Sequence, residues 1–307
     1  MTTTPPTPAR RGEGLFSPEE IPMAAYLDDP CPDPSLSSGA CHRIITRSPY
    51  HVWWTHPRLG AYDSDTGSAA DVGSVAHDLI LGGEGNIVVV DADDWRTKAA
   101  KEERDAARNA GKTPVLAHQF EEAQDMAASA RAFVDHSELL GVFTSGLSEM
   151  TMIAKDPATG VWLRARPDWV NDEARIMLHL KTTRTSANPA PFIRGIMHSM
   201  GYDVSLAFYR RVGETLGITD DRWQHVILAV EQEAPYACSL IALSPVAMAV
   251  ADDKVTRGIQ TWARCMKTGN WPAYPSAIHY AEPTAWQLAE AEAAAAESAA
   301  ESAGWRN

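Results

Sequence analysis

The stretch SAADVGSVAHDLILGG, residues 68–83, repeats apolar residues at helical spacing. The apolar positions of this face are Val72, Val75, Ala76, Leu79 and Ile80. Their spacing predicts an amphipathic helix, and the glycine pair at 82–83 is typical of a helix end. His77 belongs to this helix, which precedes the predicted sheet and could lean over it.

Further helices are predicted along the rest of the chain. Ser38 could cap a short helix, and Pro49 would begin the next one in its first turn. Glycine 201 is expected to kink a long amphipathic helix over 190–217. The remaining segments with helical patterns cover residues 95–112, 118–136 and 247–269.

Alternating and short apolar segments predict strands between these helices. Residues 148–156, 161–170 and 174–183 alternate, and turn residues separate them, so an antiparallel three-stranded meander is expected. Two later strands are predicted over 223–232 and 236–244. A short buried strand is predicted at IVVVDA, residues 87–92. The order of elements favours an α/β sandwich around a mixed sheet.

Composition and charge narrow the functional classes. The chain has 307 residues, ten Trp and 45% hydrophobic residues, enough for a sizeable core. Its net charge of −13 argues against a simple nucleic-acid coat protein. Residues 155–211 differ, because they hold nine Lys/Arg against five acids, a local charge of +4. This surplus fits either chance clustering or a surface that faces phosphates.

The chain divides into three predicted segments. Residues 1–37 are Pro-rich and predict a disordered or extended leader without the apolar core of a secretory signal. Residues 38–282 are expected to fold as one domain, and residues 283–307 as an acidic, alanine-rich helical tail. No run of 18 apolar residues occurs, so a membrane partner is not expected. HVWWTH, residues 51–56, could stack bases or pack in the core.

The hairpin RARPDWVNDEARIMLHLKTT, residues 164–183, carries the candidate chemistry. Side chains alternate along a strand, so His179 and Lys181 are expected on one face, and Asp168 on the preceding strand can meet them. A carboxylate and a second ligand on adjacent strands suit Mg²⁺ or Mn²⁺. A nearby Lys can position or help deprotonate a metal-bound water, which favours phosphodiester hydrolysis.

An ordered set of motifs between about Ser38 and Pro275 resembles one nuclease family. RPDWV followed by HLKTT is similar to the PD-(D/E)xK signature, and more narrowly to the RecE-like phage exonucleases, which typically read RPD…DLKTT. GSVAHDLIL, with His77, resembles the family's first motif, and Glu149 in SEMTMIA stands where the family places an acid. GYDVSLAFY, VEQEAPYACSLIALSP and NWPAYP are similar to its later segments.

The resemblance implies a PD-(D/E)xK restriction-endonuclease-like core over 38–282, an α/β fold with a mixed central sheet flanked by helices. It implies a metal-dependent exodeoxyribonuclease that degrades linear double-stranded DNA 5′ to 3′ and leaves 3′ single strands for recombination. Mg²⁺ or Mn²⁺ would be the cofactor. Double-stranded DNA ends, a single-strand annealing recombinase and further copies of the chain would be the partners, in the cytoplasm of a bacterium carrying a phage or prophage.

The resemblance also implies roles for individual residues. His77, Asp168 and His179 would bind metal, Lys181 would serve the nucleophilic water, and Glu149 would hold a second metal or orient water. Lys181, Asp168 and Glu149 form the expected catalytic group. The expected DNA-binding residues are Tyr202, Tyr209, Arg166, Arg184 and Ser205.

Two positions depart from the family pattern. The carboxylate before x-Lys is His179, and a Gln of the tyrosine helix is Ser205. An imidazole ligates Mn²⁺ acceptably and Mg²⁺ poorly. Three interpretations of His179 follow: altered metal preference, a catalytically impaired protein that only binds DNA, or replacement by a nearby acid such as Asp172 or Glu173. An acidic α/β interaction protein with accidental motifs is a further alternative.

Overall fold

A computed structural model of the chain describes residues 10–60 and 72–304. Two compact units are distinguished, Met1–Ala273 and Tyr274–Asn307. The first unit is built on a mixed sheet of five strands, in the order β11-β10-β9-β8-β5. Their bounds are β5 (Leu147–Ser148), β8 (Trp169–Asn171), β9 (Ile176–Thr183), β10 (Gln224–Glu231) and β11 (Cys238–Ala242). Strands β9 and β10 run parallel, and their other neighbours run antiparallel.

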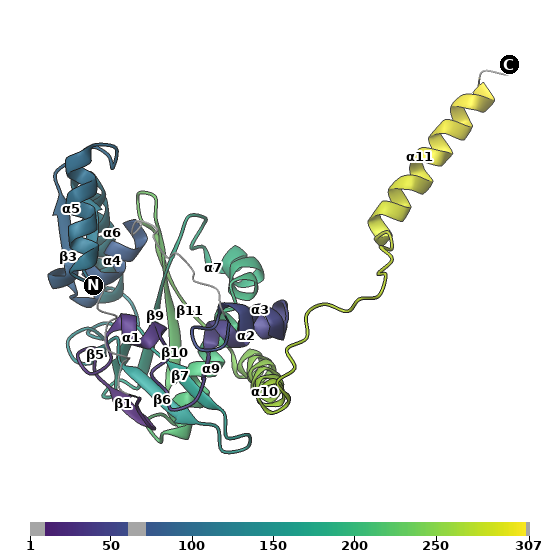
Figure 1. Cartoon of the computed structure of the whole chain (residues 1–307). Helices are drawn as coiled ribbons and strands as arrows, with labels where there is room; N and C mark the ends of the chain where they lie inside the picture. Colours follow the sequence, from purple (N-terminus) through teal and green to yellow (C-terminus); the bar gives the residue numbers. More distant parts are fainter. Residues whose placement is uncertain (1–9, 61–71, 305–307) are drawn as a thin grey trace. The chain divides into compact units, whose positions relative to one another are not determined.

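Helices cover both faces of this sheet, so the expected mixed α/β architecture is confirmed (Figure 1). Leu178 and Leu180 of β9 pack with helices α4 and α6. Met177, one residue away, packs with α2, α9 and α10 on the opposite face. This alternation is the period of two that a strand imposes. The helices are α2 (Ser38–Thr46), α4 (Val72–Leu81), α6 (Ala117–Asp135), α9 (Tyr202–Thr215) and α10 (Pro245–Thr268).

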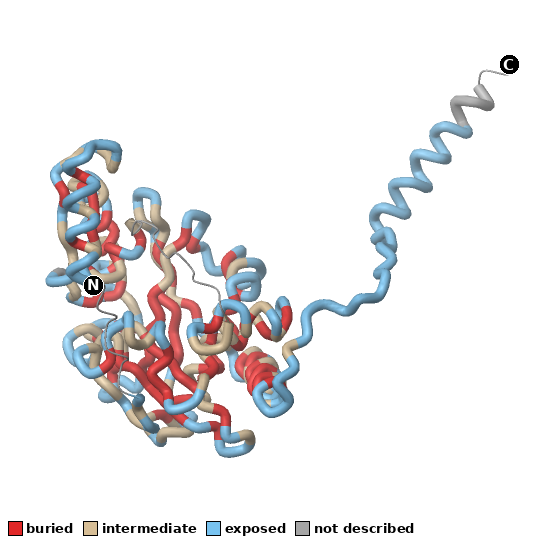
Figure 2. Tube along the Cα trace, viewed as in Figure 1, coloured by how far each residue is buried: buried red, intermediate tan, exposed pale blue. Residues whose placement is uncertain are grey.

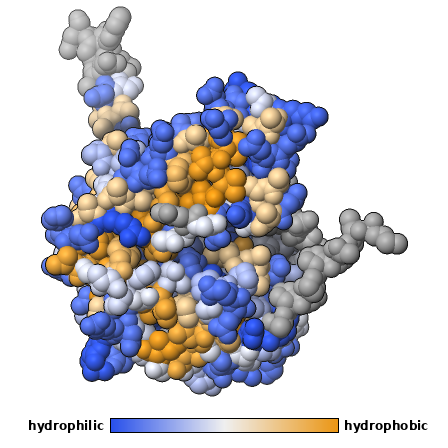
Figure 3. Space-filling model, turned by 90° about the vertical axis from the view of Figure 1, so that its left-hand side faces the viewer, coloured by the Kyte–Doolittle hydropathy of each residue, from blue (hydrophilic) through white to orange (hydrophobic). Residues whose placement is uncertain are grey.

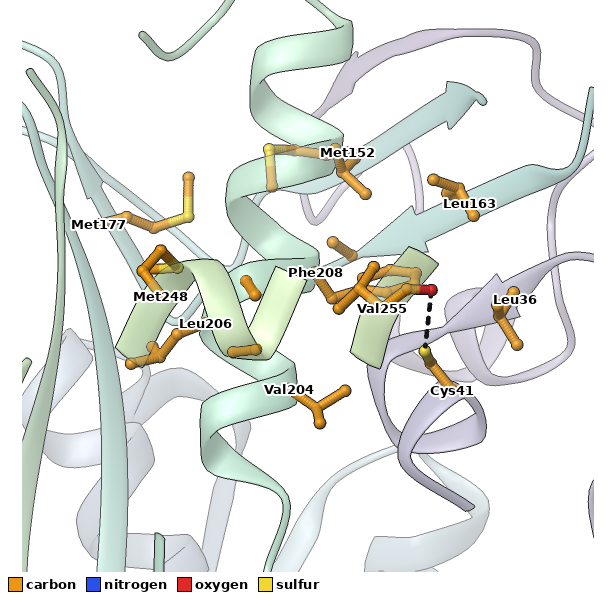
Figure 4. Close-up of a cluster of buried hydrophobic side chains, with 14 of the residues drawn as sticks. Leu36, Cys41, Met152, Leu163, Met177, Val204, Leu206, Phe208, Met248 and Val255 are labelled. Carbon is orange, nitrogen blue, oxygen red and sulfur yellow. Dashed lines mark hydrogen bonds between the residues drawn. The ribbon is translucent and has the colours of Figure 1, made fainter. Parts of the chain in front are cut away.

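Buried strands β9 and β10 form the centre of the fold, as the red tube in Figure 2 shows. Around α9, the core brings together side chains that lie far apart in the sequence (Figure 4). Phe208 of α9, Val255 of α10 and Leu36 are each fully buried or nearly so. The Cys41 thiol of α2 lies 3.9 Å from the Val255 carbonyl, which shows how closely α2 and α10 approach.

The remaining elements of the first unit are short or peripheral. Strands β3 (Ile87–Val90) and β4 (Thr113–Leu116) form a parallel pair. Ser37, rather than Ser38, caps α2, while Pro49 begins α3 as predicted. The other helices are α3 (Pro49–Thr55), η1 (Glu84–Asn86), α5 (Lys98–Asn109), α7 (Pro189–Pro191), η2 (Phe192–Ile196) and α8 (Met197–Ser199).

The N-terminal segment is more ordered than expected. Residues 1–9 lie outside the described residues, but residues 10–37 pack within the first unit. Strand β1 (Gly14–Phe16) pairs with β6 (Thr151–Lys155), and β2 (Leu36–Ser37) pairs with β7 (Trp162–Ala165). The expectation of disorder is therefore wrong for residues 10–37, whose extended parts are paired strands and which also contain α1 (Met23–Leu27).

A buried ionic network holds that segment in place. The Asp29 carboxylate is fully buried, and it accepts hydrogen bonds from the Ser35 amide at 2.9 Å and the Ser35 hydroxyl at 2.6 Å. Arg164 of β7 lies 3.4 Å from Asp29, and Arg58 lies 3.5 Å from it. Paired charges of this kind stay in a core only when partners satisfy them, and a hydrophobic pattern gives no sign of them.

The predicted meander is interrupted at a functionally important point. The strand expected over 161–170 divides into β7 and β8, with Arg166, Pro167 and Asp168 between them. Strand β7 joins a four-stranded sheet of order β1-β6-β7-β2, whereas β8 joins the central sheet. Pro167 lacks an amide hydrogen and fixes its φ angle, so it favours a break in the ladder. The meander is therefore wrong as one sheet.

The expected kink at Gly201 is a complete break in the helix. Gly201 adopts a left-handed conformation, φ 71° and ψ 27°, immediately before α9. The ring of His42 covers it so closely that a Cβ at position 201 would lie 2.3 Å from the ring. Both conformation and space therefore require glycine here.

Gly201→Ala is expected to reduce the free energy of unfolding by about 2–4 kcal/mol, because left-handed strain and overpacking act together. The matched control is Gly217→Ala, since Gly217 has φ 69° and nothing within 4 Å of its Cβ position. That control bears only the conformational cost of about 1–2 kcal/mol. Urea unfolding measures both, and equal costs would contradict the role assigned to His42.

The second unit contains α11 (Ala285–Gly304), which agrees with the predicted helical tail. Its described side chains are exposed. Among the described helices, none combines the length and apolarity needed to cross a membrane. On the α5 side of the molecule, separate apolar patches lie within a mostly hydrophilic surface (Figure 3).

Candidate metal centre and active-site cleft

Three side chains from separate elements meet at one point. Ligand atoms of His77, Glu149 and Asp168 all lie within 4.8 Å of one another. His77 Nε2 lies 3.3 Å from Asp168 Oδ1 and 3.8 Å from Glu149 Oε1. Each residue is half-buried, so the cluster remains within reach of solvent.

The break between β7 and β8 places Asp168 at the centre of this cluster. One carboxylate oxygen, Oδ2, accepts a 2.6 Å hydrogen bond from the Leu180 amide of β9. The other, Oδ1, points to His77. Burial alone would raise the pKa of Asp168, but Lys181 and His77 outweigh burial and hold this pKa well below its usual range. Asp168 is therefore ionised and oriented as a ligand.

Glu149 reaches the cluster through an unusual backbone conformation. It follows β5, and its amide donates to the Asp168 carbonyl at 3.1 Å. Its φ angle is 55°, a left-handed value that costs a non-glycine residue energy and is often found at functional sites. Burial and the charge of Asp168 raise the pKa of Glu149, against the opposing effect of Arg166.

Arg166 holds the second oxygen of Glu149. Its Nε donates to Glu149 Oε2 at 2.7 Å, and its Nη1 donates to the Ile21 carbonyl at 2.8 Å. The guanidinium also lies 5.8 Å from the ring centroid of Tyr26. The N-terminal segment thus supports the cluster, a role that sequence reasoning missed.

His77 is brought to the cluster by the apolar face of α4. Val75 and Leu79 pack in the core that contains Leu178 and Leu180 of β9. Burial lowers the pKa of His77, but hydrogen bonds to Asp168 and Asp78 and the charges of Asp168 and Glu149 raise it to about 10. The carboxylates therefore favour a positive charge at this point, which a bound cation would also supply.

Lys181 lies beside the cluster, on the face of β9 that was predicted. Its Nζ is 3.3 Å from Asp168 Oδ2 and donates to the Leu180 carbonyl at 2.9 Å. The Tyr202 ring centroid lies 5.9 Å from the same nitrogen. An ammonium in this position can orient a water near Asp168 by donating a hydrogen bond to it.

His179 lies outside this group of ligands. Its ring stacks on Tyr209 at 4.9 Å and on His225 at 5.9 Å, between α9 and β10. Only 2% of His179 is exposed, and its Nε2 has no hydrogen-bond partner among the described residues. Burial, and then the neighbouring His225, lowers the pKa of His179 well below its usual value. It is therefore a neutral ring packed in the core.

The acids proposed to replace the motif carboxylate are also elsewhere. Asp172 and Glu173 are exposed in the turn between β8 and β9. Among the described residues, the acid that joins Asp168 and His77 is Glu149. One imidazole and two carboxylates form a mixed donor set that suits a hard or borderline divalent cation. The residues present therefore fit a metal ion.

The cluster opens into a cleft of about 1140 Å³. The lining comes from α4, the hairpin end, and the N-terminal segment. Among the lining residues are Pro22 and Met23, His77, Glu149, Lys181 and Tyr202. The size of this cleft is sufficient for a polymer segment to approach the cluster.

Comparison with known proteins identifies the family of this chain. Residues 56–284 match the family described as a PDDEXK-like domain of unknown function (DUF3799). The chain belongs to this family. None of the curated proteins matches it.

Two solved structures are similar to this PDDEXK-like chain. A protein of Eubacterium rectale, described provisionally as an exonuclease, has a TM-score of 0.56 and 12% identity over 88% of this chain and 96% of its own. A phage-related exonuclease from Haemophilus somnus has a TM-score of 0.29 and 11% identity over 66% of this chain and 97% of its own. The first shares the fold of the PDDEXK-like domain.

The expected DNA-binding residues are separated within the PDDEXK-like fold. Tyr202 lines the cleft, whereas Tyr209 supports His179 from α9. Arg166 is 7% exposed and serves Glu149, which is a different role from the one expected. Arg184 is exposed beyond the end of β9 and bonds Gln232, and Ser205 is half-buried in α9. Their contribution to DNA binding stays a prediction.

Buried histidines make the stability of this PDDEXK-like chain sensitive to acid. Burial, and then Arg210, lowers the pKa of His225 to about 4. Burial, and then Arg164, lowers the pKa of His56 to about 4. The unfolded chain therefore binds more protons between about pH 6.5 and pH 4. Stability should be full above pH 6.5 and should fall as the pH falls through this window.

His225→Phe is expected to weaken the acid dependence by roughly 2–3 kcal/mol between pH 7 and pH 4, because phenylalanine has no group to protonate. Urea unfolding at several pH values measures the difference from the natural chain. The exposed His279→Phe serves as control and should leave the profile unchanged. An identical acid slope in His225→Phe and the natural chain would show that His225 is not held neutral by burial.

Proposed function

We propose that this chain is a metal-dependent exodeoxyribonuclease. The supporting observation is the cluster of His77, Glu149 and Asp168 with Lys181 on the other oxygen of Asp168, at a cleft in a PDDEXK-like fold. Two carboxylates, an imidazole and an adjacent ammonium are the groups needed for hydrolysis of a phosphodiester near a divalent cation.

The side chains would divide the chemistry among them. His77, Glu149 and Asp168 would hold Mg²⁺ or Mn²⁺, which when bound supplies Lewis acidity toward the scissile phosphate. Lys181 would orient the attacking water, and in its neutral amine form it would accept the proton that the water loses. Arg166 would keep Glu149 turned toward the cluster, because it bonds the oxygen that faces away from His77.

The proposed function also includes a substrate and partners. The substrate is linear double-stranded DNA, degraded 5′ to 3′ to leave 3′ single strands for recombination. An annealing recombinase and further copies of the chain would act with it, in the cytoplasm of a bacterium carrying a phage or prophage. These features rest on the sequence resemblance to RecE-like exonucleases.

Digestion of end-labelled linear duplex DNA tests the proposal. The chain is incubated with Mg²⁺, with Mn²⁺, or with a chelator, and closed circular DNA of the same sequence serves as control. Loss of the label from linear DNA only, and only with a cation, is the expected result. Cutting of the circular control would replace the exonuclease with an endonuclease, and no cleavage of either DNA would contradict a nuclease.

The second candidate is a catalytically impaired DNA-binding protein on the same fold. The packing of His179 away from the cluster favours it, since the motif's usual carboxylate is absent. It predicts binding of duplex ends without cleavage by the natural chain. Cleavage by His179→Asp alone would support this candidate over the active enzyme.

A further inference from the structure

A second groove lies beside α2 and α3. Its volume is about 1020 Å³, and its lining comes from α2, α3 and the turn at Ser199–Met200. The polar and charged lining residues include His42, Arg43 and Arg47. Among the lining residues that the structure describes, none is acidic, although the whole chain has a net charge of −13. A local basic surface on an acidic protein favours a polyanionic ligand.

Aromatic rings form one wall of this groove. Tyr50 stacks on Trp53 at 5.7 Å, and its ring lies 6.2 Å from that of Trp54. Tyr50 is 40% exposed and Trp54 is 42% exposed, while Val52 between them is buried. Within HVWWTH, α3 buries Val52 in the core and exposes the Trp54 ring, so one face packs while another can meet a ligand. Exposed rings beside arginines are the combination that binds unpaired bases and their phosphates.

The groove adjoins the catalytic cleft through a short piece of chain. Ser199 and Met200 line the groove, and Tyr202, two residues later, lines the cleft beside Lys181. His42 in the groove packs directly against Gly201 between them. The two sites are therefore neighbours along the chain at the start of α9.

We propose that the groove between α2 and α3 binds single-stranded DNA next to the catalytic cleft, with bases on Tyr50 and Trp54 and phosphates on Arg43 and Arg47. Duplex DNA fits this surface less well, because its bases are paired and stacked and cannot reach the rings. The position next to the cleft makes the groove a path for one separated strand. That path rests on the proposed nuclease function, whereas the binding of a single strand does not.

Binding measured in a chelator tests the groove without cleavage. Fluorescein-labelled (dT)15 and a blunt duplex are titrated with the full chain, and anisotropy is followed at several salt concentrations. Trp54→Ala is expected to weaken (dT)15 binding roughly tenfold, while Trp54→Phe retains a stacking ring and most of the affinity. Arg47→Ala should reduce the salt slope by about 0.7, the value for one phosphate of a single strand. Duplex binding should change little in each variant.

Two exposed residues elsewhere provide matched controls. Trp286→Ala removes a ring that is 70% exposed, and Arg96→Ala removes a guanidinium side chain that is 91% exposed. Both controls should bind (dT)15 like the natural chain. Circular dichroism confirms that each variant is folded.

Three outcomes would overturn the inference. Trp54→Ala could bind (dT)15 as tightly as Trp286→Ala, or the groove variants could weaken duplex and single strand equally. Alternatively, they could alter self-association alone, which would make the groove an interface between copies. Single-strand binding without any cleavage in Mn²⁺ would instead contradict the proposed nuclease and leave this groove supported.

Discussion

Asp168→Asn is expected to remove cleavage, with a loss on the order of 10³-fold or more, because it takes away the central charge of the cluster. Asparagine has the same shape, so it can still accept the hydrogen bond from the Leu180 amide. The neutral amide cannot balance the charges of His77 and Lys181, which lie 3.3 Å from the two carboxylate oxygens of Asp168. The fold should therefore persist while metal binding and hydrolysis are lost.

Rates of digestion in Mn²⁺ and Mn²⁺ titration by calorimetry measure this effect together. Asp172→Asn is the matched control, because Asp172 is an exposed acid on the same hairpin. The control should bind metal and cleave DNA like the natural chain. Cleavage by Asp168→Asn would place the reaction away from the cluster of His77, Glu149 and Asp168. Among the described residues, no other three potential ligands have atoms within 4.8 Å of one another.

The periodicity of the sequence predicts part of the site and the architecture of the fold. Asp168 and Lys181 were expected together because strand alternation and the hairpin bring them near each other, whereas the family resemblance added His77 and Glu149. Strand alternation also placed Lys181 and His179 on one face of β9, and both contact tyrosines of α9, Tyr202 and Tyr209 respectively. The expected architecture, a mixed sheet with helices on both faces, follows from the same alternation of apolar residues.

Other features depend on contacts that have no periodic signal. The break at Pro167 moves Asp168 out of a continuous strand, and the left-handed Glu149 is fixed by its bond to the Asp168 carbonyl. Arg166 becomes a support for Glu149 only because Ile21, 145 residues away, offers a carbonyl. The buried charge of Asp29 likewise orders a segment whose composition is typical of a disordered leader. Hydrogen-bond partners decided each case, and hydropathy does not reveal them.

Glu149→Gln is expected to lower metal affinity by at least about 100-fold, whereas His179→Phe should change it by less than about threefold. The first removes a ligand charge from the cluster. The second preserves the ring that stacks on Tyr209 and His225 and removes a nitrogen that has no partner. Position 179, where the family motif has a carboxylate, would then serve the packing of the core. Glu149 would supply the second negative charge of the metal site.

Calorimetric titration with Mn²⁺, followed by digestion of labelled duplex, compares the two variants under one condition. Ser148→Ala, next to Glu149, controls for disturbance of the β5 end, and circular dichroism checks that every variant is folded. Loss of metal binding in His179→Phe would contradict the assignment, because it would require the imidazole to turn toward Asp168 when a cation enters. Retention in Glu149→Gln would show that Asp168 and His77 suffice. If Glu149 is needed and His179 is not, the two carboxylates of the metal site are Asp168 and Glu149. The second carboxylate then comes from the end of β5, and β9 contributes none.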